Sequence, residues 1–95
     1  MLTVFAFVQA KPGKEKELEE ALLELVASTR QESGCKGYDL HRHRDEPSKF
    51  AFYENWEDMA ALELHRKTAH ITAFRARAGD LIAGPLQIEL FEKVS

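Results

Sequence analysis

Strand-like segments with apolar side chains on both faces constrain the fold of this chain more than any other feature. In residues 2–9 (LTVFAFVQ) successive side chains alternate between two faces, and both sets are apolar: Leu2, Val4, Ala6 and Val8 on one side, Phe5 and Phe7 on the other. The same holds in residues 49–56 and 86–92. A sheet with one solvated face alternates apolar and polar residues instead. Helices from so short a chain cover only one face, so we expect the other face to pack against a second copy, as a homodimer with sheet-sheet packing.

Turn and cap signals divide the rest of the chain into elements. Apolar residues at helical spacing, with Gly34 as a C-terminal stop, predict a helix over residues 14–33. Asp58 and Thr68 are typical N-caps, so they predict two successive helices, ending near Lys67 and Ala78. Strands are expected over residues 36–43, 49–56 and 86–92, with a break at 83–85. The order β-α-β-β-α-β predicts an α+β fold, a ferredoxin-like plait with an antiparallel sheet, in a single domain over residues 1–95.

Composition excludes several classes of protein. The chain has 95 residues, 44% of them hydrophobic and 31% charged, which is typical of an ordinary globular domain. A net charge of −3 without a basic stripe argues against a nucleic-acid partner. No apolar run is long enough for a bilayer, so we expect no membrane partner. The one cysteine, Cys35, cannot form an internal disulfide, which favours a cytoplasmic location.

Residues 52–74 concentrate the side chains that carry chemistry. Period-two alternation on the strand and i, i+3, i+6 spacing on the helix predict that one set of side chains converges between sheet and helices: Phe52, Glu54, Trp56, Met59, Leu62, His65, His70 and Phe74. An apolar slot with two imidazoles and a carboxylate at its margin is the usual make-up of a small-molecule site. The alternative is that each residue is part of the core, as a buried Trp or a helical His more often is.

Several short pieces of the sequence together resemble the antibiotic-biosynthesis-monooxygenase family. They are Pro12-Gly13, Gly34-Cys35, Tyr53-Glu54-x-Trp56, and the helical residues Ala61, His65, His70 and Phe74. The resemblance runs from roughly Thr3 to Leu90. It implies a small protein that forms a dimeric α+β barrel. Some members of this family oxidise quinols or aromatic polyketide intermediates with O2 and no cofactor, and others degrade haem, isomerise a phosphorylated sugar or have no known reaction.

The resemblance also implies roles for the residues of the predicted pocket. Haem-degrading members place an Asn in the first strand, where this chain has Phe5 and Phe7, so haem breakdown is disfavoured. We therefore expect a cofactor-independent monooxygenase acting on a small quinol-like or polyketide-like aromatic. His65 or His70 would be the base, because a histidine pKa lies near neutrality and responds to burial. Trp56 and Phe52 would stack on the substrate ring.

The remaining pocket residues have supporting roles in this prediction, in which Glu54 orients a partner group and Met59, Leu62 and Phe74 complete the wall. Two alternatives remain open. One is a non-catalytic dimer that binds a small apolar molecule, and the other is a cofactor-free isomerase that uses the same histidines. No metal and no cofactor are expected in the pocket.

A second pair of histidines, His41 and His43, lies on one face of the strand expected over residues 36–43. With Asp39 and Asp45 nearby, the pair could bind zinc, iron or nickel. A polar, solvated strand face is the favoured interpretation, because spacing provides no third ligand.

Overall fold

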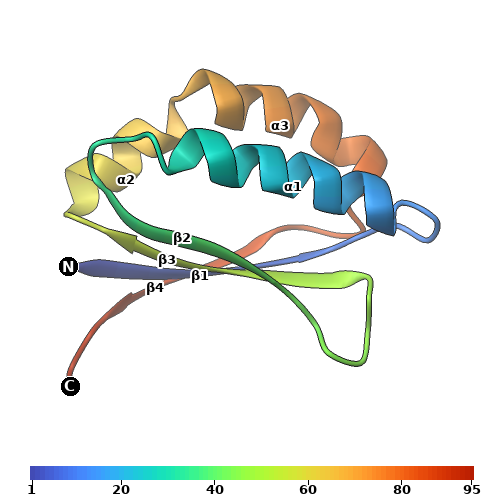
Figure 1. The fold of residues 1–95 in the computed structure, drawn as a ribbon, viewed down its shortest axis with the longest axis horizontal. Helices are drawn as coiled ribbons and strands as arrows, with labels where there is room; N and C mark the ends of the chain where they lie inside the picture. Colours follow the sequence, from blue (N-terminus) through green and yellow to red (C-terminus); the bar gives the residue numbers. More distant parts are fainter.

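A computed structural model describes residues 1–95 and has the ferredoxin-like arrangement expected from the sequence (Figure 1). The elements are β1 (Leu2–Gln9), α1 (Glu15–Thr29), β2 (Cys35–Arg42), β3 (Lys49–Trp56), α2 (Met59–Arg66), α3 (Ala69–Leu81) and β4 (Gln87–Glu92). The strands form one sheet in the order β2-β3-β1-β4, and every neighbouring pair is antiparallel. The three helices all lie on one side of the sheet, with α1 packed beside α3. No helix is both long enough and apolar enough to span a bilayer.

The predicted N-caps of the broken second helix are confirmed. The side chain of Asp58 accepts a hydrogen bond from the backbone N–H of Ala61 at 2.9 Å. Thr68 accepts one from the N–H of Ile71 at 3.4 Å. Each cap satisfies a backbone donor that has no partner within its helix. The helical structure therefore ends after α2 and begins again at α3. This break places His65 and His70 on two different helices.

Helix α1 ends at Thr29, four residues before the predicted end at residue 33. The N–H groups of Gln31 and Glu32 bond to carbonyl oxygens only three residues back, so the chain tightens into turns instead of continuing the α-helix. Gly34 is required for close packing against α2 and not as a helix stop. A Cβ at this position would lie 2.4 Å from the Cβ of Ala61, so only glycine lets the loop pass so close to α2.

The other boundaries differ less from the prediction. Helix α3 continues to Leu81, three residues beyond the expected end, and runs through Gly79 without a break. Gly84, whose φ is +76°, lies in the bend between α3 and β4. Strands β2 and β4 are each shifted or shortened by one residue, and β1 and β3 have the predicted bounds. Cys35 begins β2 half-buried against the core, as a small hydrophobe would.

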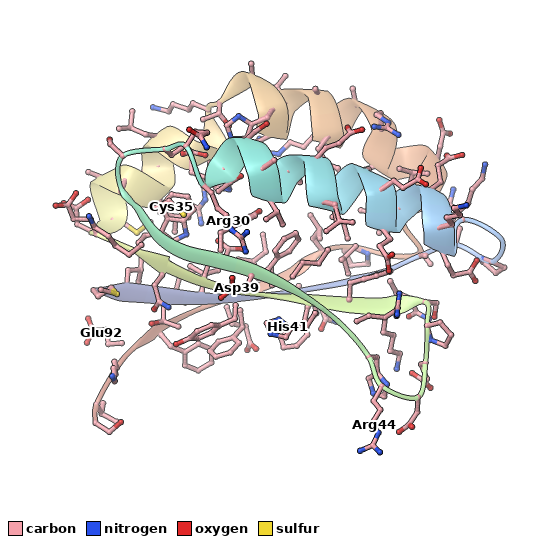
Figure 2. All side chains as sticks on the ribbon, viewed as in Figure 1. Arg30, Cys35, Asp39, His41, Arg44 and Glu92 are labelled. Carbon is pink, nitrogen blue, oxygen red and sulfur yellow. The ribbon has the colours of Figure 1, made fainter.

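The two faces of the sheet separate as the alternation predicts. Val4, Ala6 and Val8 are buried under the helices, together with Phe50 and Phe52 of the neighbouring strand β3. The opposite face carries exposed aromatic side chains, namely Phe7 (42% exposed), Tyr53 (41%) and Phe91 (47%), with Phe5 packed between Tyr53 and Phe91. His41 and Arg44 also lie on this side, away from the helices (Figure 2).

Strand β4 is exposed over its whole length, even on the helix side of the sheet. Its register with β1 puts Ile88 opposite Ala6 and Leu90 opposite Val4, so both side chains point toward the helix layer. They remain exposed because no helix packs closely over this edge strand. The space between sheet and helices therefore opens along β4.

Candidate functional site

A mostly apolar cavity of about 100 Å³ lies between the sheet and the helices. Its apolar wall comes from the inner face of β1 and β3 and from all three helices, and its open side is bordered by Leu86 and Ile88. The polar side chains in its lining are Tyr38, Glu54, His65, Arg66 and Arg75. A small apolar cavity with a few convergent polar groups is the usual form of a ligand site.

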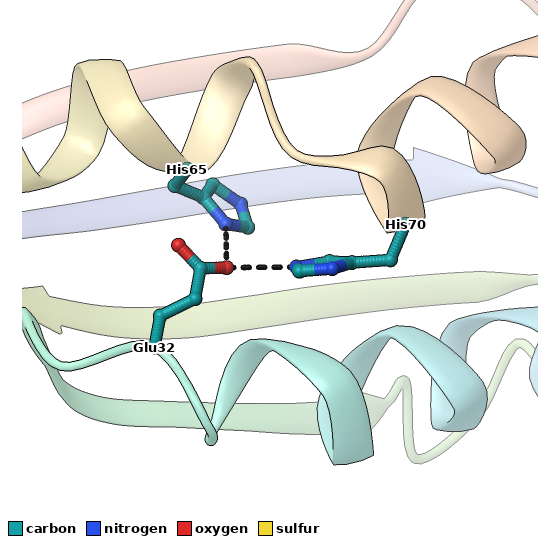
Figure 3. Close-up of side chains that lie close together, drawn as sticks. All are labelled: Glu32, His65 and His70. Carbon is teal, nitrogen blue, oxygen red and sulfur yellow. Dashed lines mark hydrogen bonds and ion pairs between the residues drawn. The ribbon is translucent and has the colours of Figure 1, made fainter.

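Glu32 joins the two histidines of the site (Figure 3). One of its carboxylate oxygens, Oε2, lies 2.7 Å from Nδ1 of His65 and 2.8 Å from Nε2 of His70. The three residues come from three elements, because Glu32 lies in the turns after α1, His65 in α2 and His70 in α3. The carboxylate can accept from both rings only if each ring carries its proton on the bonded nitrogen. This arrangement leaves Nε2 of His65 without a hydrogen-bond partner in the protein.

His65 is almost fully buried, with 6% of its surface exposed, and it lines the cavity. Burial lowers the pKa of His65 below its ordinary value, and the hydrogen bond that it donates to the Glu32 carboxylate only partly offsets this effect. His65 is therefore a neutral imidazole at pH 7, with its Nδ1 occupied and a lone pair on Nε2. That is the state in which a histidine can accept a proton from a bound molecule.

Trp56 is completely buried and connects the histidine to the sheet. Its indole N–H donates a hydrogen bond to Oε1 of Glu54 at 2.9 Å, and its ring lies 4.5 Å from the His65 ring. Burial raises the pKa of Glu54 to about 7, with the Trp56 hydrogen bond opposing the shift. Near neutral pH the Glu54 carboxyl is thus protonated in a large fraction of molecules, and it can then donate as well as accept a hydrogen bond in the cavity.

Tyr38 completes the polar side of the cavity from strand β2. Its ring packs against Phe52 at 4.7 Å and against His65 at 5.6 Å. Burial, together with the nearby Glu54, raises the pKa of Tyr38 far above its ordinary value, so the phenol stays neutral. The Thr29 side chain opposes part of this shift.

Most of the residues predicted from the sequence come together at this cavity. Its lining includes five of them: Phe52, Glu54, Leu62, His65 and Phe74. Trp56 lies behind His65 and does not line the cavity. His70 lines a neighbouring surface hollow, together with Glu24, Ser28 and Arg77. The catalytic and binding roles of these residues remain predictions.

Met59 lies elsewhere than expected. It is 44% exposed and is absent from the cavity lining, because it begins α2 one turn before Leu62, beside the exposed cap. Its contact with a substrate is untested. Two residues of the site, Glu32 and Tyr38, were not predicted. Period-two alternation from Leu40 could have placed Tyr38 on the inner face, whereas the turn that carries Glu32 has no pattern that points to the histidines.

Glu32, His65 and His70 are also the side chains whose atom types a metal ion could use, and these atoms lie within 4.8 Å of one another. In the structure the carboxylate oxygen lies at hydrogen-bond distance from both ring nitrogens, so the donors and acceptor already satisfy one another. The second pair of histidines forms no comparable cluster. His41 is exposed, and Nδ1 of His43 accepts the backbone N–H groups of Asp45 and Glu46, both at 3.1 Å.

Comparison with known proteins identifies the family of this chain. The model of the antibiotic biosynthesis monooxygenase family matches residues 1–77. "Putative monooxygenase YcnE" of Bacillus subtilis is 34% identical over 88 residues, covering 93% of each chain. "Probable quinol monooxygenase YgiN" of Escherichia coli is 28% identical, covering 93% of this chain and 95% of its own.

Solved structures agree with this result. PA3566 from Pseudomonas aeruginosa superposes with a TM-score of 0.94 at 37% identity, covering 99% of this chain and 94% of its own. Rv0793 from Mycobacterium tuberculosis gives a TM-score of 0.92 at 26% identity, covering 99% and 95%. The fold and cavity thus define a small α+β protein of the ferredoxin-like type. The chain belongs to the antibiotic biosynthesis monooxygenase family.

Proposed function

We propose that this protein is a cofactor-independent monooxygenase that oxidises a small, quinol-like aromatic with O2. One observation carries the proposal. A buried, neutral imidazole, His65, borders an apolar cavity, and its only ring nitrogen without a protein partner is Nε2. Relatives named as monooxygenases, one of them a probable quinol monooxygenase, support the reaction class.

The chemistry requires a base and a water-poor cavity. Triplet O2 reacts slowly with closed-shell organic molecules, so the substrate itself must supply the electrons. A quinol does so once a phenolic proton has been removed, and one quinol and one O2 then give one hydroxyquinone and one water without an added reductant. In this scheme Nε2 of His65 takes the phenolic proton and later returns a proton to the oxygen that leaves as water.

The other cavity residues bind and orient the ring. Phe52 offers an aromatic face for stacking, and Leu62 and Phe74 exclude water from the anion and radical that form. Glu54 and Tyr38 offer hydrogen-bond donors to a second oxygen of the substrate. Trp56 does not line the cavity, so in this proposal it holds Glu54 and packs on the base instead of stacking on the substrate ring as predicted.

Cavity size narrows the substrate class. An enclosed apolar cavity of about 150 Å³ is large enough for benzene. The cavity here measures about 100 Å³ and opens along β4, so it favours one six-membered ring over a fused polycyclic ring system. We therefore place a single-ring quinol ahead of a polyketide-like substrate.

Oxygen uptake with a graded panel of substrates tests the proposal. We expect single-ring quinols to support uptake, naphthalene-sized quinols to support less, and tricyclic ones to support none. With 18O2, mass spectrometry should find one labelled oxygen in the product and one in water. Uptake that produces only hydrogen peroxide would contradict a monooxygenase. Anaerobic rearrangement of a ligand would indicate an isomerase, and binding without turnover a non-catalytic binding protein.

The proposal includes a homodimer that assembles through the outer face of the sheet. Phe5, Phe7, Tyr53 and Phe91 form a contiguous aromatic surface there, and such a surface on a small protein usually marks an association site. Light scattering should give twice the chain mass of 10.8 kDa. Phe7→Asp should give a monomer, and Leu64→Asp, at an even more exposed apolar residue on α2, should remain a dimer. We place the enzyme in the cytoplasm, where a free thiol such as Cys35 stays reduced.

A further inference from the structure

The Glu32 bridge connects two imidazoles that face different surroundings. His65 lines the apolar cavity and its side chain is 7% exposed, whereas the His70 side chain is 23% exposed and lines a hollow on the outer surface. Each ring uses one nitrogen for Glu32 and has the other free of protein hydrogen bonds. On His65 the free nitrogen is Nε2, and on His70 it is Nδ1 (Figure 3).

The bridge also limits how much charge the two rings hold. Their centres are 6.0 Å apart, and the bridging carboxylate is itself 16% exposed, so a positive charge on both rings would be poorly screened. One carboxylate supports one imidazolium well, whereas a second imidazolium meets the repulsion of the first. The pair is therefore suited to carrying a single positive charge that either ring can hold.

We propose that Glu32 couples His65 and His70 into one proton-exchanging unit, in which a proton taken from the cavity by Nε2 of His65 is matched by a proton released to solvent from Nδ1 of His70. The role of this unit in turnover rests on the proposed function, whereas its geometry does not. Both N–H bonds to Glu32 stay intact during the exchange, so no proton has to cross the carboxylate. His65 is the residue that meets substrate, and Glu32 and His70 are positioning residues.

This coupling answers a requirement of the proposed reaction. Conversion of a quinol to a hydroxyquinone removes both O–H hydrogens and one C–H hydrogen from the substrate. One of these three hydrogens ends on the new hydroxyl group and two end in water. A base inside an apolar cavity must change its protonation state between these steps. Exchange of charge with a ring at the surface lets His65 do so without water entering the cavity.

Other titratable groups also face the unit, and their charges affect its protonation. Arg66 follows His65 on α2, and Glu54 and Tyr38 face the His65 ring from the sheet. Cys35 of β2 lies near Glu32, and Glu24 and Arg77 line the hollow beside His70. Arg66 opposes a positive charge on His65 and so contributes to its lowered pKa.

A measurement without substrate tests the geometry of the unit. In 15N-histidine NMR spectra of the full chain at pH 8, we expect His65 to carry its hydrogen on Nδ1 alone. In Glu32→Ala, which removes the acceptor, the hydrogen should shift largely to Nε2, and in the control His41→Gln it should not move. His65 protonated on Nε2 in the wild type would overturn the proposal. So would a stoichiometric transition metal in untagged protein, because it would occupy the bonded ring nitrogens.

Chemical rescue tests the role in turnover. We expect His70→Ala to lower kcat for a quinol by about tenfold with KM nearly unchanged, and millimolar imidazole to restore most of the loss through the surface hollow. Imidazole should not rescue His65→Ala to the same degree, since the cavity excludes it once substrate is bound. Loss of activity in His70→Ala without rescue would overturn the coupling. If the NMR result holds but no quinol supports oxygen uptake, the proposed function fails and the coupled pair stands.

Discussion

The chain contains two pairs of histidines, and the difference between them shows how an imidazole becomes a functional group. His41 and His43 are only two residues apart at the end of β2, so their proximity is evident from the sequence alone. His65 and His70 lie on separate helices, yet one carboxylate oxygen joins them. Only the second pair has a buried member beside a cavity.

Burial and a partner from a distant segment, not proximity in sequence, distinguish the two pairs. His41 points to the outer face of the sheet, and His43 accepts two backbone hydrogen bonds in its own hairpin. Neither ring has an acidic partner held by another element. The four predictions below test this contrast in order of expected effect.

Replacing the buried base should have the largest effect. We expect His65→Gln to lower kcat for a single-ring quinol by about 10²- to 10⁴-fold, the usual contribution of a general base. The matched variant His41→Gln should retain wild-type turnover. Oxygen-electrode kinetics measure both, with circular dichroism to confirm folding. Equal losses in the two variants would remove the distinction between the pairs.

Stability should depend on pH through the buried site. The pKa of Glu54 is about 7 in the folded protein, against 4.5 as the ordinary value, so the folded state binds this proton more tightly. The resulting stabilisation is present below pH 4.5 and is lost as pH rises through 7, by about 3 kcal/mol in all. His65 acts in the opposite sense, because its lowered pKa favours the unfolded chain as pH falls below 6.5.

Comparing Glu54→Gln with the wild type isolates the first of these effects, since Gln can still accept the Trp56 hydrogen bond. Relative to wild type, the variant should become more stable by about 3 kcal/mol between pH 4.5 and pH 8. Urea denaturation at fixed protein concentration measures the difference. A pH-independent difference for Glu54→Gln would contradict the assignment of the raised pKa.

The loop that delivers Glu32 should be sensitive to a single methyl group. Gly34→Ala places a Cβ 2.4 Å from that of Ala61, so we expect a loss of about 1–3 kcal/mol from overpacking, together with altered NMR signals of His65 and His70. Gly79→Ala is the control, because its Cβ would meet nothing within 4 Å and it lies in a helix. That change should stabilise the protein by about 0.5–1 kcal/mol. A neutral Gly34→Ala would show that the loop can move without disturbing the bridge.

Removing an exposed histidine should have the smallest effect. His43→Ala deletes an acceptor for two backbone N–H groups, but these lie in an exposed loop where water can replace it. We expect a cost below about 1 kcal/mol by urea denaturation. A loss above about 2 kcal/mol would mean that this pair, too, has a structural role that its exposure conceals.

Local patterns in the sequence were sufficient for most of the fold. The alternation in β1 and β3 predicted both apolar faces, and Asp58 and Thr68 predicted the break between α2 and α3. These features depend on neighbours two to four residues apart, so the sequence states them directly. The predicted end of α1 was wrong by four residues. The turn at Gln31 depends on the contacts that Glu32 and Gly34 make with distant segments of the chain.

What the sequence by itself determined is therefore the element order, the two apolar faces of the sheet and the set of side chains near His65. Only the tertiary structure decided that Glu32 bridges the histidines, that Trp56 lies behind the base and that Met59 lies outside the cavity. Such facts join residues up to 38 positions apart, as Glu32 and His70 are. Hydrophobic periodicity fixes which way a side chain points, but a hydrogen bond between distant segments depends on where the whole chain places them.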